Sequence, residues 1–400
     1  MKILSVNAGS SSLKFRLYEM PEEKLLVKGM FERIGSEDSS YNLRLGEDKI
    51  SIHTEIRNHD DAVKILIQEL LDRKIIKNIS EISGVGHRVV HGGNFYSHSV
   101  LINPRVLMEI DALRNLAPLH NPASVSGIKA FMKEDANILE VACFDTAFHQ
   151  TMKEDVYLYS VPYEWYTKYN VRKYGFHGLS HKYITDVMKE KLNTDDVNLI
   201  ICHIGSGASI TAVKDGKCID TSMGFTPNAG LMMGTRSGNI DYSIISHVMK
   251  SADLTIDEID KKLNYESGLY GIAGMSDLRD IDRAYESKEQ KAILAVDMYT
   301  SRIVDYIAKY HMKLGRVDAI CFTAGGGEND AIIRGEVVKK LSPINVYLDE
   351  EKNNITVVRK GIQGIITTPK SKIPCYVIAT DEELMIARDT YKLVNHEWWI

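Results

Sequence analysis

"LIICHIGSGASITAVKDGKCIDTSMG", residues 199–224, decides the fold, because the same layout occurs a second time in the chain. The stretch starts with an apolar segment, passes through a Gly/Ser turn into an alternating segment, and turns at Asp215-Gly216 into a third segment. Residues 1–30 repeat this order around the Gly/Ser turn at 7–12. Two copies, about two hundred residues apart, predict a duplicated domain.

The Gly/Ser turns have two interpretations. Glycine and serine commonly only reverse the chain. They also let backbone N–H groups approach an anion closely, and Lys14 adds a positive charge beside the first turn. A matched pair of such turns would hold opposite ends of a polyphosphate.

A third glycine cluster, "FTAGGGEND" at 322–330, follows an apolar segment and precedes a periodic one. This placement suits a nucleotide at a helix N-terminus. The cluster does not fit G-x-G-x-x-G, and the chain contains no G-x-x-x-x-G-K-[ST]. A nucleotide would therefore be bound by neither of these common motifs.

The bulk composition narrows the class of protein. A chain of 400 residues is too long for one ordinary core, which predicts two domains. The net charge of −5 and pI near 6.2 argue against a general nucleic-acid binder. No apolar run reaches the ~18 residues of a membrane span, and the first run, which stops at Asn7, is too short for a signal peptide. The five cysteines lack C-x-x-C spacing, which predicts reduced core thiols in a cytoplasmic protein.

The hydrophobic pattern predicts an α/β protein. Helical periodicity appears in the segments 63–70, 184–192 and 292–310. Continuous apolar runs at 199–204, 317–322 and 376–378 predict strands buried on both faces. Helices and strands thus alternate, as in α/β folds. The Pro/Tyr-rich stretch 159–178 is predicted to be a loop that follows a domain boundary.

Five islands between these elements are rich in His, Arg or Asp: 86–93, 117–122, 142–149, 174–181 and 230–241. Cationic side chains and an acid on Gly-flanked loops suit phosphoryl transfer, which needs charge stabilisation and positioning. A zinc site is disfavoured. His87 and His91 lie in a strand-like run, where their spacing spans ~13 Å, and His177 and His181 lack the glutamate of H-E-x-x-H. No G-x-S-x-G supports a serine hydrolase.

The chain resembles the acetate kinase (acetokinase) family over essentially its whole length. The matching motifs, in order, are "NAGSSSLKF", "HRVVHGG", "APLHNP", "FDTAFH", "YGFHGLSH", "GLMMGTRSG" and "EELMIARDT". The resemblance implies two duplicated α/β domains of the actin/hexokinase (ribonuclease H-like) type around a central cleft, commonly in a homodimer. It places an acceptor-side domain at 1–149 plus 385–400, and a nucleotide-binding and dimerisation domain at 150–384.

The same resemblance implies reversible transfer of the γ-phosphoryl group of ATP to acetate, giving acetyl phosphate and ADP. The implied cofactor is Mg²⁺, with Mn²⁺ as a substitute, and neither nucleic acid nor a membrane is an expected partner. Two alternatives stay open: a kinase for propionate or another short acid, and an inactive nucleotide-gated binding protein on the same fold. The joint presence of Arg88, Asp145, His177 and Arg236 argues against the inactive protein.

Roles follow from the resemblance residue by residue. The implied catalytic residues are Asp145, His177 and Arg236, with Arg88 binding the acceptor carboxylate and Asn7 and Glu382 organising the metal. The implied acceptor pocket comprises Val90, Leu119, His120, Phe176 and Pro227. The implied nucleotide contacts are Ser10, Ser12, Lys14, His203, Ile204, Gly205, Ser206, Gly207, Asp277, Leu278, Arg279, Gly325, Gly326, Gly327, Glu328 and Asn329.

Elementary chemistry qualifies the role of Asp145. An acceptor carboxylic acid with a pKa of ~4 is already ionised at neutral pH, so the forward reaction has no proton to remove. We therefore expect Asp145 to orient Arg88 or to hold a magnesium-bound water.

The chain departs from the family pattern at several donor-side positions. Ser206 and Asp381 each replace a usual Asn, Asn228 and Ala229 replace Leu and Glu, and "TAGGGEN" replaces "TGGIGEN". Asp381 adds a carboxylate beside Glu382, which would alter magnesium binding. The strand and glycine cluster at 317–329 still predict ATP rather than pyrophosphate as donor.

Overall fold

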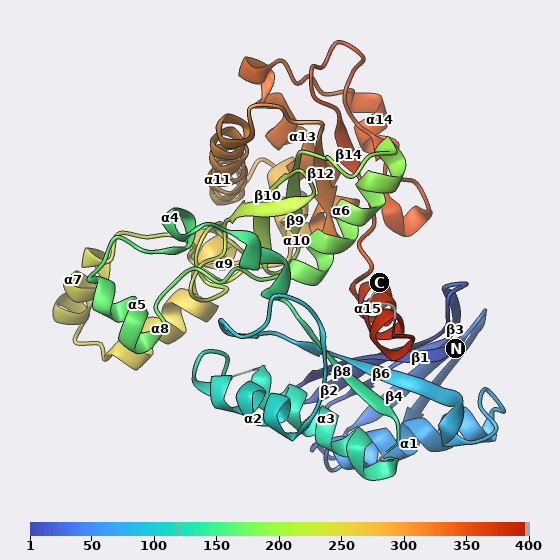
Figure 1. Ribbon diagram of the computed structural model, residues 1–400. Helices are drawn as coiled ribbons and strands as arrows, with labels where there is room; N and C mark the ends of the chain where they lie inside the picture. Colours follow the sequence, from blue (N-terminus) through green and yellow to red (C-terminus); the bar gives the residue numbers. More distant parts are fainter. Residues whose placement is uncertain (119, 136, 397–400) are drawn as a thin grey trace. The chain divides into compact units, whose positions relative to one another are not determined.

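The computed structural model describes residues 1–118, 120–135 and 137–396 and divides into two compact units (Figure 1). The first unit comprises residues 1–150 together with the chain from Asp381 onward, and the second comprises Thr151–Thr380. The first unit thus takes in the C-terminal helix from its first turn, whereas the sequence placed the return at residue 385. Within the described ranges, no helix combines the length and the apolar character needed to cross a membrane.

An eight-stranded sheet in the order β5-β4-β3-β2-β1-β6-β8-β7 forms the first unit. Its strands are β1 (Lys2–Gly9), β2 (Ser12–Glu19), β3 (Lys24–Glu32), β4 (Ser40–Leu45), β5 (Asp48–His53), β6 (Ile82–Val89), β7 (Val100–Leu101) and β8 (Leu139–Phe144). Its helices are α1 (His59–Asp72), α2 (Pro104–Ala112), α3 (Asn121–Glu134) and α15 (Glu382–Val394). The strands β1, β6 and β8 are parallel, and β2 to β5 form antiparallel neighbours.

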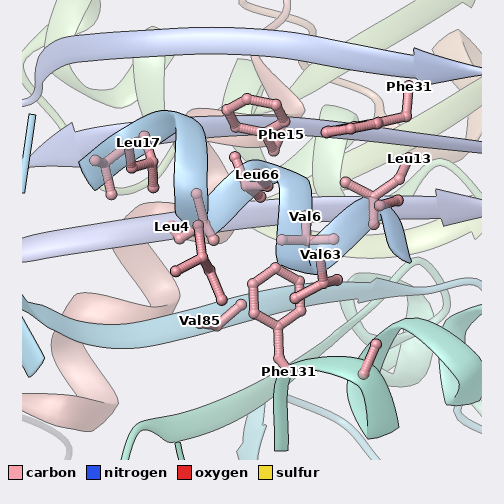
Figure 2. Packing of buried hydrophobic residues seen from close by; sticks show 14 of the residues in the cluster. Leu4, Val6, Leu13, Phe15, Leu17, Phe31, Val63, Leu66, Val85 and Phe131 are labelled. Atoms are coloured by element: carbon pink, nitrogen blue, oxygen red, sulfur yellow. The ribbon is translucent and has the colours of Figure 1, made fainter. Parts of the chain in front are cut away.

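Strand β1 is covered on both faces. Leu4 packs in one cluster with Val63 of α1 and Phe131 of α3, as Figure 2 shows. Ile3 points to the other face, where it packs with Ala387 of α15. Successive side chains of a strand alternate between faces, so an almost continuous apolar run is needed here.

Glycines in β6 let α15 pack directly on the sheet. A Cβ on Gly86 would lie 2.6 Å from the Ile386 side chain, and a Cβ on Gly84 would lie 2.7 Å from Val394. Both glycines lie on the same face of the strand as Arg88, two and four residues further on. The close packing therefore brings the first turn of α15 to the Arg88 end of β6.

The second unit repeats this topology in a six-stranded sheet of order β11-β10-β9-β12-β14-β13. Its strands are β9 (Leu199–Ile204), β10 (Ala208–Lys214), β11 (Lys217–Thr221), β12 (Ala319–Thr323), β13 (Gly364–Ile365) and β14 (Cys375–Val377). The antiparallel trio β11-β10-β9 followed by parallel β12 and β14 matches β3-β2-β1 followed by β6 and β8. The predicted duplication is confirmed by this shared strand order.

Eleven α-helices accompany this sheet in the described part of the second unit: α4 (Glu154–Tyr157), α5 (Tyr163–Tyr169), α6 (Gly178–Leu192), α7 (Ser243–Ala252), α8 (Ile256–Tyr265), α9 (Gly268–Ala273), α10 (Leu278–Glu286), α11 (Gln290–Leu314), α12 (Ala324–Asn329), α13 (Ala331–Lys339) and α14 (Glu350–Ile355). Among the described residues, short 3-10 turns lie at Ile79–Glu81, Leu113–Asn115, Ala147–Thr151, Ser342–Ile344 and Val358–Lys360. The helices α11 and α6 lie on opposite faces of the sheet (Figure 1). Lys313 of α11 binds Asp220 of β11, whereas His181 of α6 binds Ser209 of β10.

The sequence-based elements are largely confirmed. The three periodic segments lie in α1, α6 and α11, and the three apolar runs overlap β9, β12 and β14. The prediction of a loop over 159–178 is wrong for Tyr163–Tyr169, which form α5, and the chain passes between the units earlier, after Gln150. The glycine cluster also differs from a simple loop, because residues 324–329 are themselves helical.

Candidate active site

In the first unit, the strand ends of β1, β6 and β8 and the start of α15 carry the expected acceptor-side residues. Arg88 lies near the end of β6 and is 20% exposed at its side chain. Its Nε donates to both carboxylate oxygens of Asp145 at 3.1 and 3.2 Å, and its Nη2 donates to Oδ2 at 2.7 Å. The remaining nitrogen, Nη1, lies 3.5 Å from a carboxylate oxygen of Glu382. One guanidinium is thus shared by two carboxylates.

The ion pairs around Arg88 shift the pKa values of the groups that form them. Burial acts to lower the pKa of Arg88, but the carboxylates of Asp145 and Glu382 outweigh it and raise that pKa. Burial raises the pKa of Asp145, and the Arg88 guanidinium acts against this rise. Asp145 is only 2% exposed, so its ion pair with Arg88 is held in a largely water-free setting.

The first Gly/Ser turn forms the tip of the β1–β2 hairpin. Gly9 pairs with Ser12 across the turn, and Asn7 pairs with Lys14. The Lys14 ammonium, which remains partly exposed, forms an ion pair with Glu383 of α15. Lys14, Ser10 and Ser12 therefore lie at one hairpin, and α15 already supplies a partner for the lysine.

Asp381 contacts Arg16 and the first turn of α15. Its Oδ2 accepts a hydrogen bond from Arg16 at 2.7 Å, and its Oδ1 caps α15 by accepting from the Leu384 N–H at 2.9 Å. Arg16 also approaches Glu383 at 3.3 Å. The additional carboxylate is therefore neutralised by Arg16 and fixes the start of α15, where Glu382 follows.

The expected acceptor pocket is divided between the units. Val90 and His120 lie in the first unit, half-buried and exposed respectively, and Leu119 lies outside the described residues. Phe176 is buried and Pro227 half-buried in the second unit. A pocket that includes all of these residues remains a prediction.

In the second unit, two cationic or imidazole groups converge on Gly207. A Cβ on Gly207 would lie 3.3 Å from Arg236 Nη1 and 3.4 Å from His177 Nε2. Arg236 Nη1 also donates to the Pro227 carbonyl at 3.4 Å, and burial lowers the pKa of Arg236. The bare backbone of the second Gly/Ser turn thus leaves space beside both groups.

His177 is held by neighbouring polar groups. It precedes α6 in a left-handed conformation with φ of 59°, which turns the chain sharply into the helix. Its Nδ1 lies 2.9 Å from the Ser209 hydroxyl, which also lies 2.8 Å from His181 Nε2. The His203 ring stacks on His177 at 4.1 Å, and its Nδ1 lies 2.8 Å from the Ser180 hydroxyl.

A cavity of about 340 Å³ in the second unit gathers half of the expected nucleotide residues. Of the expected set, Gly205, Ser206, Asp277, Leu278, Arg279, Gly325, Gly326 and Asn329 line it. A Cβ on Gly326 would lie 2.7 Å from the Leu278 side chain, so this glycine permits close packing of α12 on α10. The size and the mixture of glycine, serine and charged residues suit a small polar ligand.

Other expected nucleotide residues support this cavity from outside its lining. Ile204 and Gly327 are buried. The Glu328 carboxylate accepts from the Ala324 N–H at 3.0 Å and from the Thr380 N–H at 2.9 Å, which ties α12 to the end of the unit. Sequence reasoning missed seven lining residues, among them Asp282 and Asp330. A helix-capping aspartate and an acid in a charged helix give no signal that distinguishes them from surface residues.

The residues expected to bind Mg²⁺ are compatible with the ligands that this ion prefers. No group of three His, Cys, Asp or Glu side chains suited to a metal occurs in the described ranges. Mg²⁺ commonly binds to one or two protein carboxylates and completes its shell with water and phosphate oxygens. Glu382 and Asp145, which share the Arg88 guanidinium, supply carboxylates of this kind. Asn7 on β1 stays a predicted ligand.

The comparisons with known proteins agree over nearly the whole chain. A model of the acetokinase family matches residues 2–388. A curated relative from Bacillus cytotoxicus named acetate kinase is 51% identical over 397 residues, covering 98% of this chain and 99% of the relative. Two solved structures each cover 98% of this chain and 99% of their own: Porphyromonas gingivalis acetate kinase, with 41% identity and a TM-score of 0.93, and a Francisella tularensis propionate kinase, with 41% identity and a TM-score of 0.92. This chain has the same actin/hexokinase-like fold, and it belongs to the acetokinase family.

Proposed function

We propose that this chain is an acetate kinase, which reversibly transfers the γ-phosphoryl group of ATP to acetate and forms acetyl phosphate and ADP. The observation that carries the proposal is the 51% identity, across 98% of the chain, to a relative of that name. The Arg88–Asp145 pair and the His177–Arg236 pair around Gly207 support it, because they supply the charges that phosphoryl transfer requires.

Arg88 binds the acceptor carboxylate in this proposal. Its fork is fixed by Asp145, which occupies Nε and Nη2, and Nη1 faces the carboxylate of Glu382. Asp145 acts as a positioning residue, because an ionised acceptor has no proton to give up. Val90 and His120, which lie in the same unit as Arg88, are proposed to contact the acyl chain, so the first unit is the proposed acceptor side. The family resemblance also implies Leu119, Phe176 and Pro227 as contacts of the acyl chain.

His177 and Arg236 stabilise the transferring phosphoryl group. Both groups approach the backbone at Gly207, where negative charge on the equatorial oxygens would collect. Ser209 holds the His177 Nδ1, which directs the Nε2 toward this space. The cavity beside the same turn binds the nucleotide. The family resemblance implies Lys14, Ser10 and Ser12, on the β1–β2 hairpin of the first unit, as phosphate contacts.

Asn7 and Glu382 would hold the Mg²⁺ ion, with Mn²⁺ as a substitute. When bound, the ion neutralises phosphate charge and orients the phosphates for in-line transfer. The chain's own contribution is a fixed Glu382, because Arg16 and Asp381 hold the first turn of α15.

The second unit carries a surface suited to another copy of the chain. Exposed apolar residues gather on α5, α7 and α8, which lie together in Figure 1: Tyr163, Trp165, Tyr169, Tyr242, Ile244, Ile256 and Tyr265. Helix α7 reads SIISHVMKSA and yet buries none of its residues, while Tyr242 beside it is 83% exposed. A homodimer would cover this face. In sedimentation experiments, Ile244→Asp should yield monomers. Met312→Asp, at an exposed position of α11, is the control and should leave the dimer intact. A wild-type chain that sediments as a monomer would refute the dimer.

The cytoplasm is the proposed location, since all five cysteines are buried in the fold, as expected of core thiols. The activity itself is tested by hydroxylamine trapping of acyl phosphate formed from acetate and MgATP. Parallel reactions with propionate measure the acceptor preference, and one methylene should change kcat/KM by only about 10- to 200-fold. Failure to form a hydroxamate from any short carboxylic acid would contradict the proposed function.

A further inference from the structure

Two hydroxyl groups behind the second Gly/Ser turn have no role in the mechanism above. The Ser180 hydroxyl, on the first turn of α6, lies 2.8 Å from His203 Nδ1 and 2.8 Å from the Thr380 hydroxyl. Ser180 is completely buried, and His203 is 7% exposed. The two hydroxyls therefore form a short line that ends on the ring of a residue expected to contact the nucleotide.

Backbone contacts fix both ends of this line. His203 lies on β9, which is paired with β10 on one side and with β12 on the other. The Thr380 N–H donates to the Glu328 carboxylate at 2.9 Å, and the same oxygen accepts from the Ala324 N–H at 3.0 Å. Thr380 is thereby tied to α12, whose first glycines line the cavity. The hydroxyl line thus connects two walls of the same site.

The hydrogens of the two hydroxyls assign the direction of the line. If Thr380 donates to Ser180 and Ser180 donates to His203 Nδ1, both hydroxyl hydrogens are used. In the reverse direction, Nδ1–H donates to Ser180 and Ser180 donates to Thr380, whose own hydrogen then has no acceptor within the described ranges. Buried polar groups normally form their hydrogen bonds, which favours the first direction. Nδ1 then carries no hydrogen, so the neutral ring carries it on Nε2.

The other nitrogen of the His203 ring faces the second Gly/Ser turn. A Cβ on Gly205 would lie 3.8 Å from His203 Nε2, and Gly205 lines the cavity. The His203 ring also stacks on the ring of His177, whose Nε2 faces Gly207 in the same turn. A hydrogen on His203 Nε2 is therefore placed where an anionic oxygen held by this turn could accept it.

We propose that Ser180 is a positioning residue for the nucleotide phosphates. Its hydroxyl, oriented by Thr380, holds His203 in the Nε2–H form, and the ring donates that hydrogen to a phosphate oxygen of the bound nucleotide. This inference rests on the proposed function, because it takes the cavity to be the nucleotide site. The Ser180–Thr380 pair acts on the phosphoryl donor and not on the acceptor, so its loss should change nucleotide affinity alone.

The first test is ¹⁵N NMR of the wild-type full chain with labelled histidine rings, at pH 8, above the ordinary histidine pKa of ~6.5. The signals that disappear in His203→Gln identify His203. We expect an unprotonated Nδ1 and a protonated Nε2, and we expect saturating MgADP to shift the Nε2 signal. An Nδ1–H form, or an Nε2 signal that MgADP leaves unshifted, would overturn the inference without any change at Ser180.

The second test compares variants by calorimetric titration with MgADP. Ser180→Ala should weaken ADP binding about tenfold, because hydrogen bonds to charged groups are strong, and should leave the KM for acetate within about twofold. Thr380→Val should weaken ADP binding a few-fold, and Thr380→Ser, which keeps the hydroxyl, should restore it. Thr185→Val is the matched control, because Thr185 is also buried on α6 but donates to the His181 carbonyl of its own helix. It should bind ADP as the wild type does.

A double variant shows whether Thr380 acts through Ser180. Ser180→Ala/Thr380→Val should bind ADP no more weakly than Ser180→Ala alone, and losses that multiply would overturn the proposed line. Unchanged ADP affinity in Ser180→Ala would overturn it as well. The hydroxamate reaction judges the proposed function separately. A chain that makes acetyl phosphate while Ser180→Ala binds ADP normally keeps its function and loses this assignment, whereas a chain that shows the expected His203 signals but forms no hydroxamate loses the proposed function.

Discussion

Arg88 and Asp145 form a two-pronged ion pair in which Nε and Nη2 of the guanidinium both reach the carboxylate, the shorter bond being 2.7 Å. The pair joins the end of β6 to the residue after β8. Since these parallel strands are neighbours, the sheet itself sets the direction in which the arginine points. Asp145 is thereby suited to aim Arg88 rather than to move a proton.

The first prediction separates these two roles of Asp145. Asp145→Asn keeps the shape but weakens the hold on Arg88, and a displacement of about 1 Å can cost on the order of 10²-fold in rate. We expect kcat in the hydroxamate assay to fall by about that factor.

A double variant provides the control. If Asp145 acts through Arg88, then Arg88→Ala/Asp145→Asn should be no slower than Arg88→Ala alone. Losses that multiply in the double variant would show that Asp145 acts on the substrate directly.

The second prediction concerns the space beside Gly207. Gly207→Ala would place a Cβ 3.3 Å from Arg236 Nη1 and 3.4 Å from His177 Nε2. Both groups would have to shift, so kcat should fall about 10²-fold while the Kd for ADP changes little. A near-normal kcat for Gly207→Ala would show that the two groups do not act at this point.

The third prediction concerns the tautomer of His177. The Ser209 hydroxyl has one hydrogen and lies 2.9 Å from His177 Nδ1 and 2.8 Å from His181 Nε2, so at most one ring can accept from it and at least one ring must donate to it. Ser209→Ala removes this constraint. We expect a roughly tenfold lower kcat and altered ¹⁵N shifts of the His177 ring, with recovery in Ser209→Thr. Unchanged ring shifts in Ser209→Ala would refute the coupling.

Much of this architecture could be predicted because local patterns report local structure. The repeated strand, Gly/Ser turn and strand led to the two matching sheets, and the apolar run at 199–204 is β9. Long-range pairings gave no such signal. Lys14 and Glu383 lie far apart in sequence and form an ion pair only because α15 returns to the first sheet. Asp381 and Arg16 form an ion pair for the same reason.

The candidate site shows the same limit. The motifs indicated Arg88, Asp145, His177 and Arg236 one by one, but the shared guanidinium and the convergence on Gly207 depend on tertiary packing. Asp282 lies in the helical segment LRDIDRAYE, where a run of charges is typical of a solvent-exposed face. Its burial could not be predicted because it depends on how α10 packs against α11 and α12.

The fourth prediction concerns Ala324, which has φ of 64° in the stretch where the family pattern has glycine. An L-residue with a Cβ in this conformation costs roughly 1–2 kcal/mol. Ala324→Gly should therefore raise the free energy of unfolding by about 0.5–1 kcal/mol, after the greater entropy of glycine in the unfolded chain is deducted. Urea unfolding measures the change, and a lower midpoint for the variant would contradict it.

The fifth prediction concerns Asp282 and pH. Burial and the nearby carboxylates of Asp330, Glu286 and Asp277 raise the pKa of Asp282 from 3.8 to about 7 in the folded chain. The folded state therefore holds a proton on Asp282 between about pH 4 and pH 7 that the unfolded state has lost, so this residue lowers stability progressively as the pH rises through that window. Asp282→Asn cannot ionise, and its amide can donate to the unpartnered oxygen of Asp330. Without nucleotide, the variant should unfold at a higher temperature than the wild type, by ~3 °C or more at pH 8 and by less at pH 5, corresponding to on the order of 1–2 kcal/mol. Thermal unfolding followed by circular dichroism at both pH values measures this difference.

Asp280→Asn on the exposed side of α10 is the control and should show no such pH trend. If Asp282→Asn raised the unfolding temperature equally at pH 5 and pH 8, Asp282 would be ionised at both pH values and its carboxylate already satisfied, which would contradict the prediction.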